Sequence, residues 1–219
     1  MQKFSLAICG PTARDAMRLS PRGYGLCALV IACLLSAVNV SPATAREEDS
    51  VRDFVERVND ASTALLASGS NAAQKCRRLL GWAFDVPAMA GYALGTTWNK
   101  ATSAERRAFL AAFEDEIVAA YVRRMAAYRG ATMSFVGARA PTGGDRLAAS
   151  RLIVPGGPEQ TWIWRLRPAG QTWRIVDVSV DGRSALHAER QEYAEILETN
   201  HGDIDAVIAF VRRRAGGGS

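Results

Sequence analysis

The stretch that decides the fold lies near the middle of the chain and reads FDVPAMAGYALGTTW, residues 84–98. Asp85 and Pro87 mark a helix start, because an aspartate side chain caps free backbone N–H groups and a proline suits the first turn. Gly91 and Gly95 then punctuate short turns. The stretch therefore predicts a short helix and turns placed directly before a long amphipathic segment over 103–128.

That amphipathic segment is expected to be the longest helix of the chain. Thr102 and Glu105 have the spacing of a capping box at its start. Large apolar residues then recur at every fourth position, which keeps them on one drifting face of a helix. These residues are Phe109, Phe113, Ile117, Tyr121 and Met125. Arginines and carboxylates between them supply a solvated side.

The remaining periodicity predicts helices first, a sheet second and helices last. Residues 46–68 and 75–80 read as helices that the SGSN break at 68–71 separates. Four strands are expected at 132–136, 147–154, 160–166 and 173–180, joined by Gly/Pro turns as an antiparallel meander. Trp162, Trp164 and Leu166 alternate onto one face, as do Val176, Val178 and Val180. Helices over 185–198 and from Asp203 onward complete an α+β domain, a curved sheet wrapped by helices.

The first 45 residues read as a secretory signal peptide. An apolar run over 26–40 is short for a membrane span, and Ala43-x-Ala45 fits a signal-peptidase site. Met17 is the expected true start, residues 46–215 the single folded domain, and 216–219 a flexible tail. An uncleaved anchor is the alternative. Such a segment predicts export from the cytoplasm.

Removing that segment changes what composition implies. It takes away four basic residues and one acidic residue, which lowers the formal net charge from +5 to +2. No argument for a nucleic-acid partner survives this subtraction. Three of the four cysteines also leave, and Cys76 alone cannot form an internal disulfide. The fold must therefore rest on its apolar core.

Several motifs, taken together in order and spacing, resemble one known family. They are FD at 84–85 with MA at 89–90, LG at 94–95 with Trp98, RRxFxxxF at 106–113, Tyr121, WRIVDVSVDGRS at 173–184, and RxxYxxIL at 190–197. The pattern is similar to the MlaC, or toluene-tolerance, family of periplasmic phospholipid-binding proteins, over roughly residues 50–212. Asp181, Arg183 and Tyr193 depart from the family's usual residues, and Arg183 is expected at the mouth of a pocket.

The resemblance implies an NTF2-like α+β cone whose four-stranded antiparallel sheet and helices enclose an apolar cavity. It implies a carrier of phospholipid acyl chains with head groups toward solvent, acting as the substrate-binding component of an ABC-type lipid transport system. The implied partners are an outer-membrane lipoprotein complex and an inner-membrane ABC transporter with an MCE-domain ring. A monomer without catalytic residues, metal or cofactor is expected, with bound phospholipid as cargo.

Moving a fatty chain out of water is worth about 0.8 kcal/mol per CH₂, so such a site needs apolar walls rather than a polar constellation. The expected lipid-binding set consists of large apolar residues on facing elements. It comprises Met89, Leu94, Phe109, Phe113, Ile117, Tyr121, Ile153, Trp162, Trp164, Val176, Val178 and Ile196. Each of these residues also fits an ordinary core.

Other functions remain open at this point. A paralogue could bind hopanoids or another polycyclic lipid. A scaffold with a packed interior and no ligand is another possibility. Related cones host isomerases and dehydratases that use a pocket Asp, Tyr or His, for which Asp177 is the candidate here. His187 and His201 lack the context of a catalytic or zinc site. Three basic pairs, at 77–78, 106–107 and 123–124, fit either lipid phosphates, acidic partners or a solvated helix face.

Overall fold

The computed structural model describes residues 42–66, 71–141 and 143–217, which belong to one compact unit over 40–219. The predicted Met17 start and the apolar run of the predicted signal segment lie outside these residues. The first helix begins at Pro42, so the four residues before the proposed mature start are helical. Within the described ranges, no helix has the length and apolarity needed to span a membrane.

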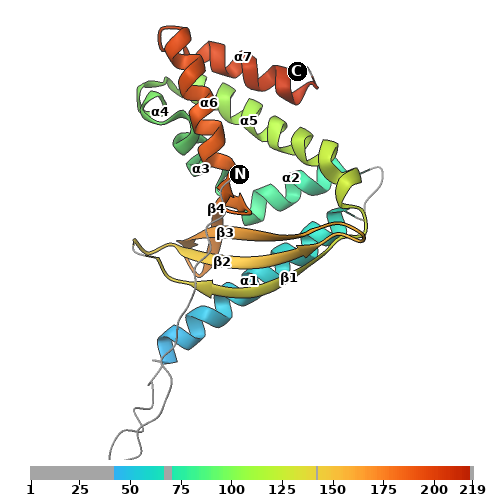
Figure 1. Cartoon of the computed structure of the whole chain (residues 1–219). Coiled ribbons are helices and arrows are strands. Elements are labelled where there is room, and N and C mark those ends of the chain that lie inside the picture. Colours follow the sequence, from blue (N-terminus) through green and yellow to red (C-terminus); the bar gives the residue numbers. More distant parts are fainter. Residues whose placement is uncertain (1–41, 67–70, 142, 218–219) are drawn as a thin grey trace, which may run out of the picture. The chain divides into compact units, whose positions relative to one another are not determined.

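The described chain has helices first, then the strands, then two more helices, in the predicted order (Figure 1). The elements are α1 (Pro42–Leu66), α2 (Ala72–Ala83), α3 (Val86–Leu94), α4 (Thr96–Lys100), α5 (Ser103–Arg124), the 3-10 turn η1 (Met125–Tyr128), β1 (Thr132–Arg139), β2 (Arg146–Ile153), β3 (Glu159–Ala169), β4 (Thr172–Val180), β5 (Arg183–Ser184), α6 (Ala185–Thr199) and α7 (Ile204–Ala215). The strands form one antiparallel meander in sequence order. The predicted α+β class is confirmed, with the two-residue β5 added to the four expected strands.

The predicted helix starts are confirmed by side-chain caps. Asp85 accepts a hydrogen bond from the Ala88 N–H at 3.0 Å and so begins α3. At α5 the Glu105 N–H donates to Thr102 Oγ1 at 3.2 Å, and the Thr102 N–H donates to the Glu105 carboxylate at 2.6 Å. The expectation that α5 is the longest helix is wrong, because it has 22 residues and α1 has 25. After Arg124, where α5 ends, the chain continues as the 3-10 turn η1.

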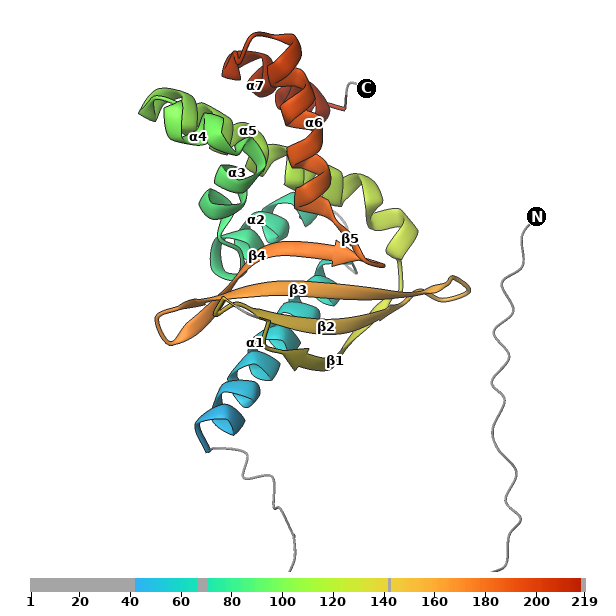
Figure 2. The same cartoon turned by 60° about the vertical axis from the view of Figure 1, so that its left-hand side comes forward.

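Two views show how the helices are arranged around the sheet. Helix α1 runs along the sheet, while α3 to α7 lie together beyond the β4 edge (Figures 1 and 2). One set of buried residues joins α1, α2, one face of the sheet and Val118 of α5, and we call it the sheet-side cluster. A second set joins α3, α5, α6 and α7, and we call it the helical cluster. Phe84, Val86 and Ile117 pack against both clusters.

A β-bulge in β4 changes which valines face inward. Arg165 pairs with Asp177 but Leu166 pairs with Ile175, so Val176 is the extra residue between them. Val178 remains opposite Trp164 on the inner face. The expectation that Val176, Val178 and Val180 share one face is therefore wrong, because the bulge puts Ile175 there in place of Val176.

Candidate functional site

The twelve residues expected to bind lipid do not meet in one place. One group packs in or against the sheet-side cluster: Ile117, Tyr121, Trp162, Trp164 and Val178. A second group belongs to or packs against the helical cluster: Met89, Leu94, Phe109, Phe113, Ile196 and again Ile117. The other two residues join neither group. Val176 is buried in the bulged strand, and Ile153 is 46% exposed because it alternates with the buried Leu152 on β2.

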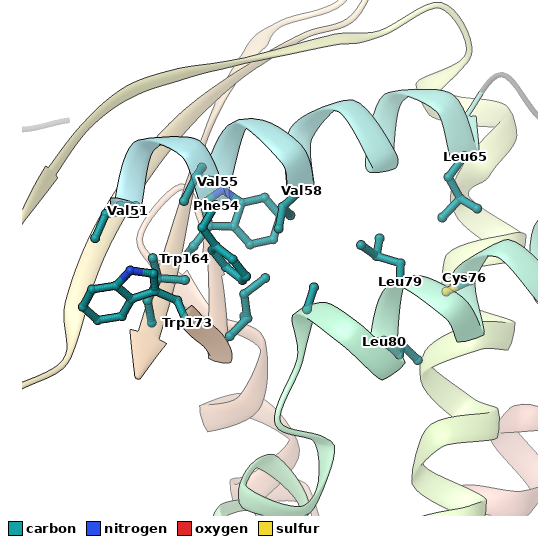
Figure 3. Close-up of a cluster of buried hydrophobic side chains, with 14 of the residues drawn as sticks. Val51, Phe54, Val55, Val58, Leu65, Cys76, Leu79, Leu80, Trp164 and Trp173 are labelled. Atoms are coloured by element: carbon teal, nitrogen blue, oxygen red, sulfur yellow. The ribbon is translucent and has the colours of Figure 1, made fainter. Parts of the chain in front are cut away.

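The sheet-side cluster is an apolar layer between two helices and a sheet. Figure 3 shows the side chains of Val51, Phe54 and Val58 on one side of α1, the side on which the sheet and α2 lie. Trp164 and Trp173 contribute from the sheet, and both are buried. Tyr121 packs at the edge of this layer and its hydroxyl donates to the Ser62 carbonyl at 3.4 Å. The apolar surface of this layer comes from α1, from α2 and from the sheet.

A short polar chain crosses this apolar layer. The Trp164 indole N–H donates to Ser150 Oγ at 2.9 Å, and Ser150 Oγ donates to Asn59 Oδ1 at 3.0 Å. All three side chains are buried. The Nδ2 group of Asn59 has no hydrogen-bond partner among the described residues. The chain ties α1 to β2 and β3 within the layer, because buried polar groups cost stability unless they are paired.

The helical cluster is built around an aromatic group. Phe109 stacks on Phe113 at 5.6 Å between ring centroids and meets the edge of Tyr193 at 5.8 Å. The Tyr193 hydroxyl is buried without a hydrogen-bond partner among the described residues, and burial raises the pKa of this phenol. Phe109, Phe113 and Tyr193 are all essentially inaccessible. This packing is that of a structural core.

Two arginines of the recognised motifs have structural roles around the α3–α4 corner. Arg106 donates to the carbonyls of Trp98 and Asn99 at 2.9 and 3.1 Å, which satisfies the end of α4. Arg190 donates to the Tyr92 carbonyl at 2.6 Å and lies over the Tyr92 ring. Arg106 therefore holds the end of α4 in place.

One hollow lies at the surface, beside the sheet-side cluster. It is an open groove of about 670 Å³ between α2, α5 and α7. Val118, Ala119 and Val122 of α5 form an apolar strip along it. The full lining is Ala73, Arg77, Asp115, Val118, Ala119, Val122, Arg123, Arg212, Ala215, Gly216 and Gly217. Because Val118 also belongs to the sheet-side cluster, the groove and that apolar layer share a wall.

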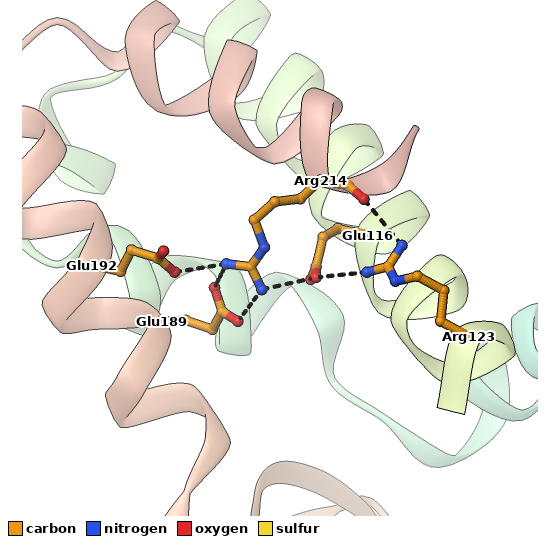
Figure 4. Close-up of polar contacts among 5 residues, drawn as sticks. All are labelled: Glu116, Arg123, Glu189, Glu192 and Arg214. Carbon is orange, nitrogen blue, oxygen red and sulfur yellow. Dashed lines mark hydrogen bonds and ion pairs between the residues drawn. The ribbon is translucent and has the colours of Figure 1, made fainter. Parts of the chain in front are cut away.

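One end of the groove is fixed by an ionic cluster, drawn in Figure 4. Arg214 of α7 donates to the carboxylates of Glu116 at 2.9 Å, Glu189 at 2.9 Å and Glu192 at 2.7 Å. Arg123 donates to the Arg214 carbonyl at 3.0 Å. The cluster joins α5, α6 and α7, and so positions the end of α7 that lines the groove.

Burial and pairing act in opposite directions within this ionic cluster. Burial raises the pKa of Glu116, which is 4% exposed, although the nearby Arg214 opposes that rise. For Arg214 burial would lower the pKa, yet hydrogen bonding to Glu189 and the surrounding carboxylates raises it. The cluster therefore favours the charge of Arg214 more than that of Glu116.

The candidate catalytic residue has structural contacts. Asp177 accepts from Ser184 Oγ at 2.8 Å and from the Leu186 N–H at 3.4 Å, which anchors the start of α6. Its side chain alternates away from Val178 and the inner face. Arg183 forms β5 opposite Val180 and is not among the residues that line the groove. The described residues contain no group of three or more His, Cys, Asp or Glu that could hold a metal ion.

Sequence reasoning missed several parts of this arrangement. The expected lipid-binding set left out α1 altogether, although the three- and four-residue steps of Val51, Phe54 and Val58 carried the signal. It also left out Val118 and Arg212, which line the groove. No sequence signal identifies the groove, because its walls are brought together from helices far apart in the chain.

Comparisons with known proteins bear on what this arrangement does. A family model described as "MlaC protein" matches residues 48–213. The fold is similar to that of a phospholipid-binding protein from Ralstonia solanacearum, solved in complex with a phospholipid. The two share 17% sequence identity with a TM-score of 0.66, over 76% of this chain and 97% of that chain.

Proposed function

Because the chain belongs to the MlaC family, we propose that it is a periplasmic phospholipid carrier. The match over residues 48–213, which includes every described strand, is the observation that carries this proposal. The phospholipid bound to the similarly folded Ralstonia protein supports it. Family and fold point to a binding protein rather than an enzyme.

The acyl chains are proposed to lie in the sheet-side layer rather than in the helical cluster. The sheet-side layer has half-buried members, Trp162 and Val178 among them, and it shares Val118 with the open groove. The helical cluster is instead centred on the stacked, fully buried Phe109 and Phe113. Separating α1 and α2 from the sheet would expose apolar walls to the chains, at a gain of about 0.8 kcal/mol per buried CH₂.

The wider system is proposed from the family. In it the protein, a monomer exported by a cleavable signal peptide, serves as the substrate-binding component of an ABC-type transport system. It would exchange lipid with an outer-membrane lipoprotein complex and with an inner-membrane ABC transporter bearing an MCE-domain ring. Cargo would be carried without any bond being made or broken, so neither metal nor cofactor is required.

Native mass spectrometry tests the proposal. The protein is purified from periplasm without detergent, and its adducts are identified by lipid extraction. We expect diacyl phospholipid at a fixed stoichiometry. A hopanoid adduct would instead assign the chain to a polycyclic-lipid branch, and a protein that stays free of lipid even after incubation with phospholipid vesicles would contradict carriage altogether.

A further inference from the structure

The groove between α2, α5 and α7 has a composition that suits an amphipathic anion. Its strip of Val118, Ala119 and Val122 is apolar, while guanidinium groups come from all three helices. These are Arg77 on α2, Arg123 on α5 and Arg212 on α7. Asp115 is the one carboxylate residue among the described residues that line it. Arg77 forms ion pairs with Glu114 and Asp115. Arg123 lies 3.9 Å from Glu116. Among the groove arginines of the described residues, Arg212 alone has no carboxylate partner, so it supplies the uncompensated positive charge beside the apolar strip.

These three arginines keep free capacity for a ligand. Arg77 and Arg123 have side chains 46% and 45% exposed. Arg77 donates one hydrogen bond to Glu114 and one to Asp115, and Arg123 donates one to the Arg214 carbonyl. A guanidinium has five N–H donors, so each retains several. For Arg212, the described residues show no side-chain hydrogen bond or ion pair.

The fold distinguishes these arginines from their neighbours in sequence. Arg78, Arg124 and Arg213 are exposed and do not line the groove. Arg106 is held by carbonyls of α4. One arginine of each of these three basic runs therefore lines the groove, and the arginine next to it in sequence lies outside the groove.

The wall that the groove shares with the sheet-side layer indicates where the rest of the ligand goes. Val118 is 3% exposed and belongs to both, and Val122 is 41% exposed along the same helix. An acyl chain that displaces the Val118 side chain would pass from the groove into the apolar layer between α1, α2 and the sheet. The anionic end would stay at the arginines, where guanidinium groups match phosphate oxygens in geometry and charge.

We infer that this groove holds the phosphate of the bound phospholipid, with Arg77, Arg123 and Arg212 as its contacts. The inference rests on the proposed function and adds to it a recognition of the phosphate itself. A carrier with this site distinguishes a phospholipid from a diacylglycerol with the same acyl chains. The distinction follows because the two ligands differ in the phosphate and the group attached to it, not in the chains.

The test compares two double variants of equal charge change. Arg77→Gln/Arg212→Gln alters the groove, and Arg78→Gln/Arg213→Gln alters the adjacent arginines outside it. Each delipidated protein is incubated with palmitoyl-oleoyl phosphatidylglycerol, with the corresponding phosphatidylethanolamine, or with palmitoyl-oleoyl glycerol. Bound lipid is counted by native mass spectrometry. The groove variant should lose roughly tenfold or more of the preference for phospholipid, because two guanidinium groups that hydrogen-bond the phosphate are removed.

The expected result is that wild type and the outer variant prefer both phospholipids over the diacylglycerol, while the groove variant takes the diacylglycerol nearly as well. Equal preference in all three proteins would overturn the inference and leave lipid carriage standing. Failure of wild type to take up any of the three lipids would contradict the proposed function instead. Micromolar binding of inorganic phosphate alone, measured by calorimetry, would assign the groove to free phosphate and overturn the inference.

Thermal unfolding of each variant serves as the folding control. If the groove double variant does not fold, Arg212→Gln against Arg213→Gln decides the question. The described residues show no hydrogen bond or ion pair for either side chain, so neither substitution removes one. A preserved phospholipid preference in Arg212→Gln would then overturn the role of Arg212.

Discussion

At Gly95, a single residue allows α6 to approach the α3–α4 corner. Its φ is +59°, a conformation that side chains disfavour, and an added Cβ would lie 3.0 Å from the Arg190 guanidinium. Gly95→Ala is expected to destabilise the fold by about 2 kcal/mol, through backbone strain and displacement of Arg190. Urea unfolding followed by circular dichroism measures this.

The matched control for that substitution is Gly81 in α2. Open space surrounds the position of its missing Cβ, and its backbone is not left-handed. Gly81→Ala is therefore expected to stabilise by about 0.5–1 kcal/mol, because alanine loses less backbone entropy in a helix. Equal effects of the two substitutions would show that neither the backbone conformation nor Arg190 matters at Gly95.

Cys76 provides a second prediction at the scale of one residue. Its thiol is buried in the sheet-side cluster, and burial raises its pKa to about 11. Because the thiolate is the reactive form, labelling by a disulfide reagent at pH 8 should be slow in the native protein and rapid in urea. Labelling should accelerate as the pH is raised toward 11. Fast native labelling at pH 8 would contradict the packing of α2.

At the scale of elements, the caps were predictable because they depend on neighbouring residues. Thr102 with Glu105, and Asp85 ahead of α3, were both read correctly from local sequence. The bulge was not, because strict alternation is assumed whenever a strand such as β4 is read alone. Only the register against β3 reveals that Ile175 replaces Val176 on the inner face.

The ionic cluster that joins α5, α6 and α7 leads to a prediction about two of its members. Arg214→Met would leave Glu116 as a buried carboxylate without its closest cationic partner, and should cost about 3 kcal/mol. Glu116→Gln should cost less than 1 kcal/mol, because it removes a charge that burial disfavours. Chemical denaturation of both variants at pH 7 provides the measurement. A larger cost for Glu116→Gln would reverse the assignment.

Wild type and Glu116→Gln together test the pH dependence of stability. The pKa of Glu116 is raised in the folded state above its ordinary value of 4.5, so folding favours the protonated carboxyl. Acidification from pH 7.5 to 4.5 should therefore stabilise wild type relative to Glu116→Gln. Asp145 acts in the opposite sense. Burial alone would raise its pKa, but Arg165 and Arg167 hold that pKa below its ordinary 3.8. The stability that ionised Asp145 contributes is therefore lost only below this pH window. A difference that stays flat with pH would contradict the raised pKa.

At the scale of the whole molecule, the sequence identified the apolar residues but not how they divide. Phe113 and Tyr121 lie on one helical ladder, yet Phe113 packs in the helical cluster and Tyr121 against the sheet-side cluster. The four-residue step drifts around the helix, so successive residues of α5 face different partners. Periodicity shows that a residue is buried. It does not show which distant element covers that residue. The covering element determines whether the residue lines a ligand site or packs in a structural core.

The division into two clusters makes a prediction about cargo. Val178 is half-buried on the inner face beside the sheet-side cluster, whereas Ile163 is half-buried on the opposite face of the same sheet. Val178→Trp fills space that acyl chains are proposed to use, and should reduce bound phospholipid by about half or more at some cost in stability. Ile163→Trp should leave lipid content unchanged.

Native mass spectrometry of both variants, purified identically from periplasm, measures lipid per protein, and thermal unfolding verifies that each is folded. Equal lipid content in folded Val178→Trp and Ile163→Trp would place the chains elsewhere. Phe113→Leu then separates the remaining possibilities, since it alters the helical cluster with a modest change in volume. Lipid loss in folded Phe113→Leu alone would move the cargo to the helical cluster.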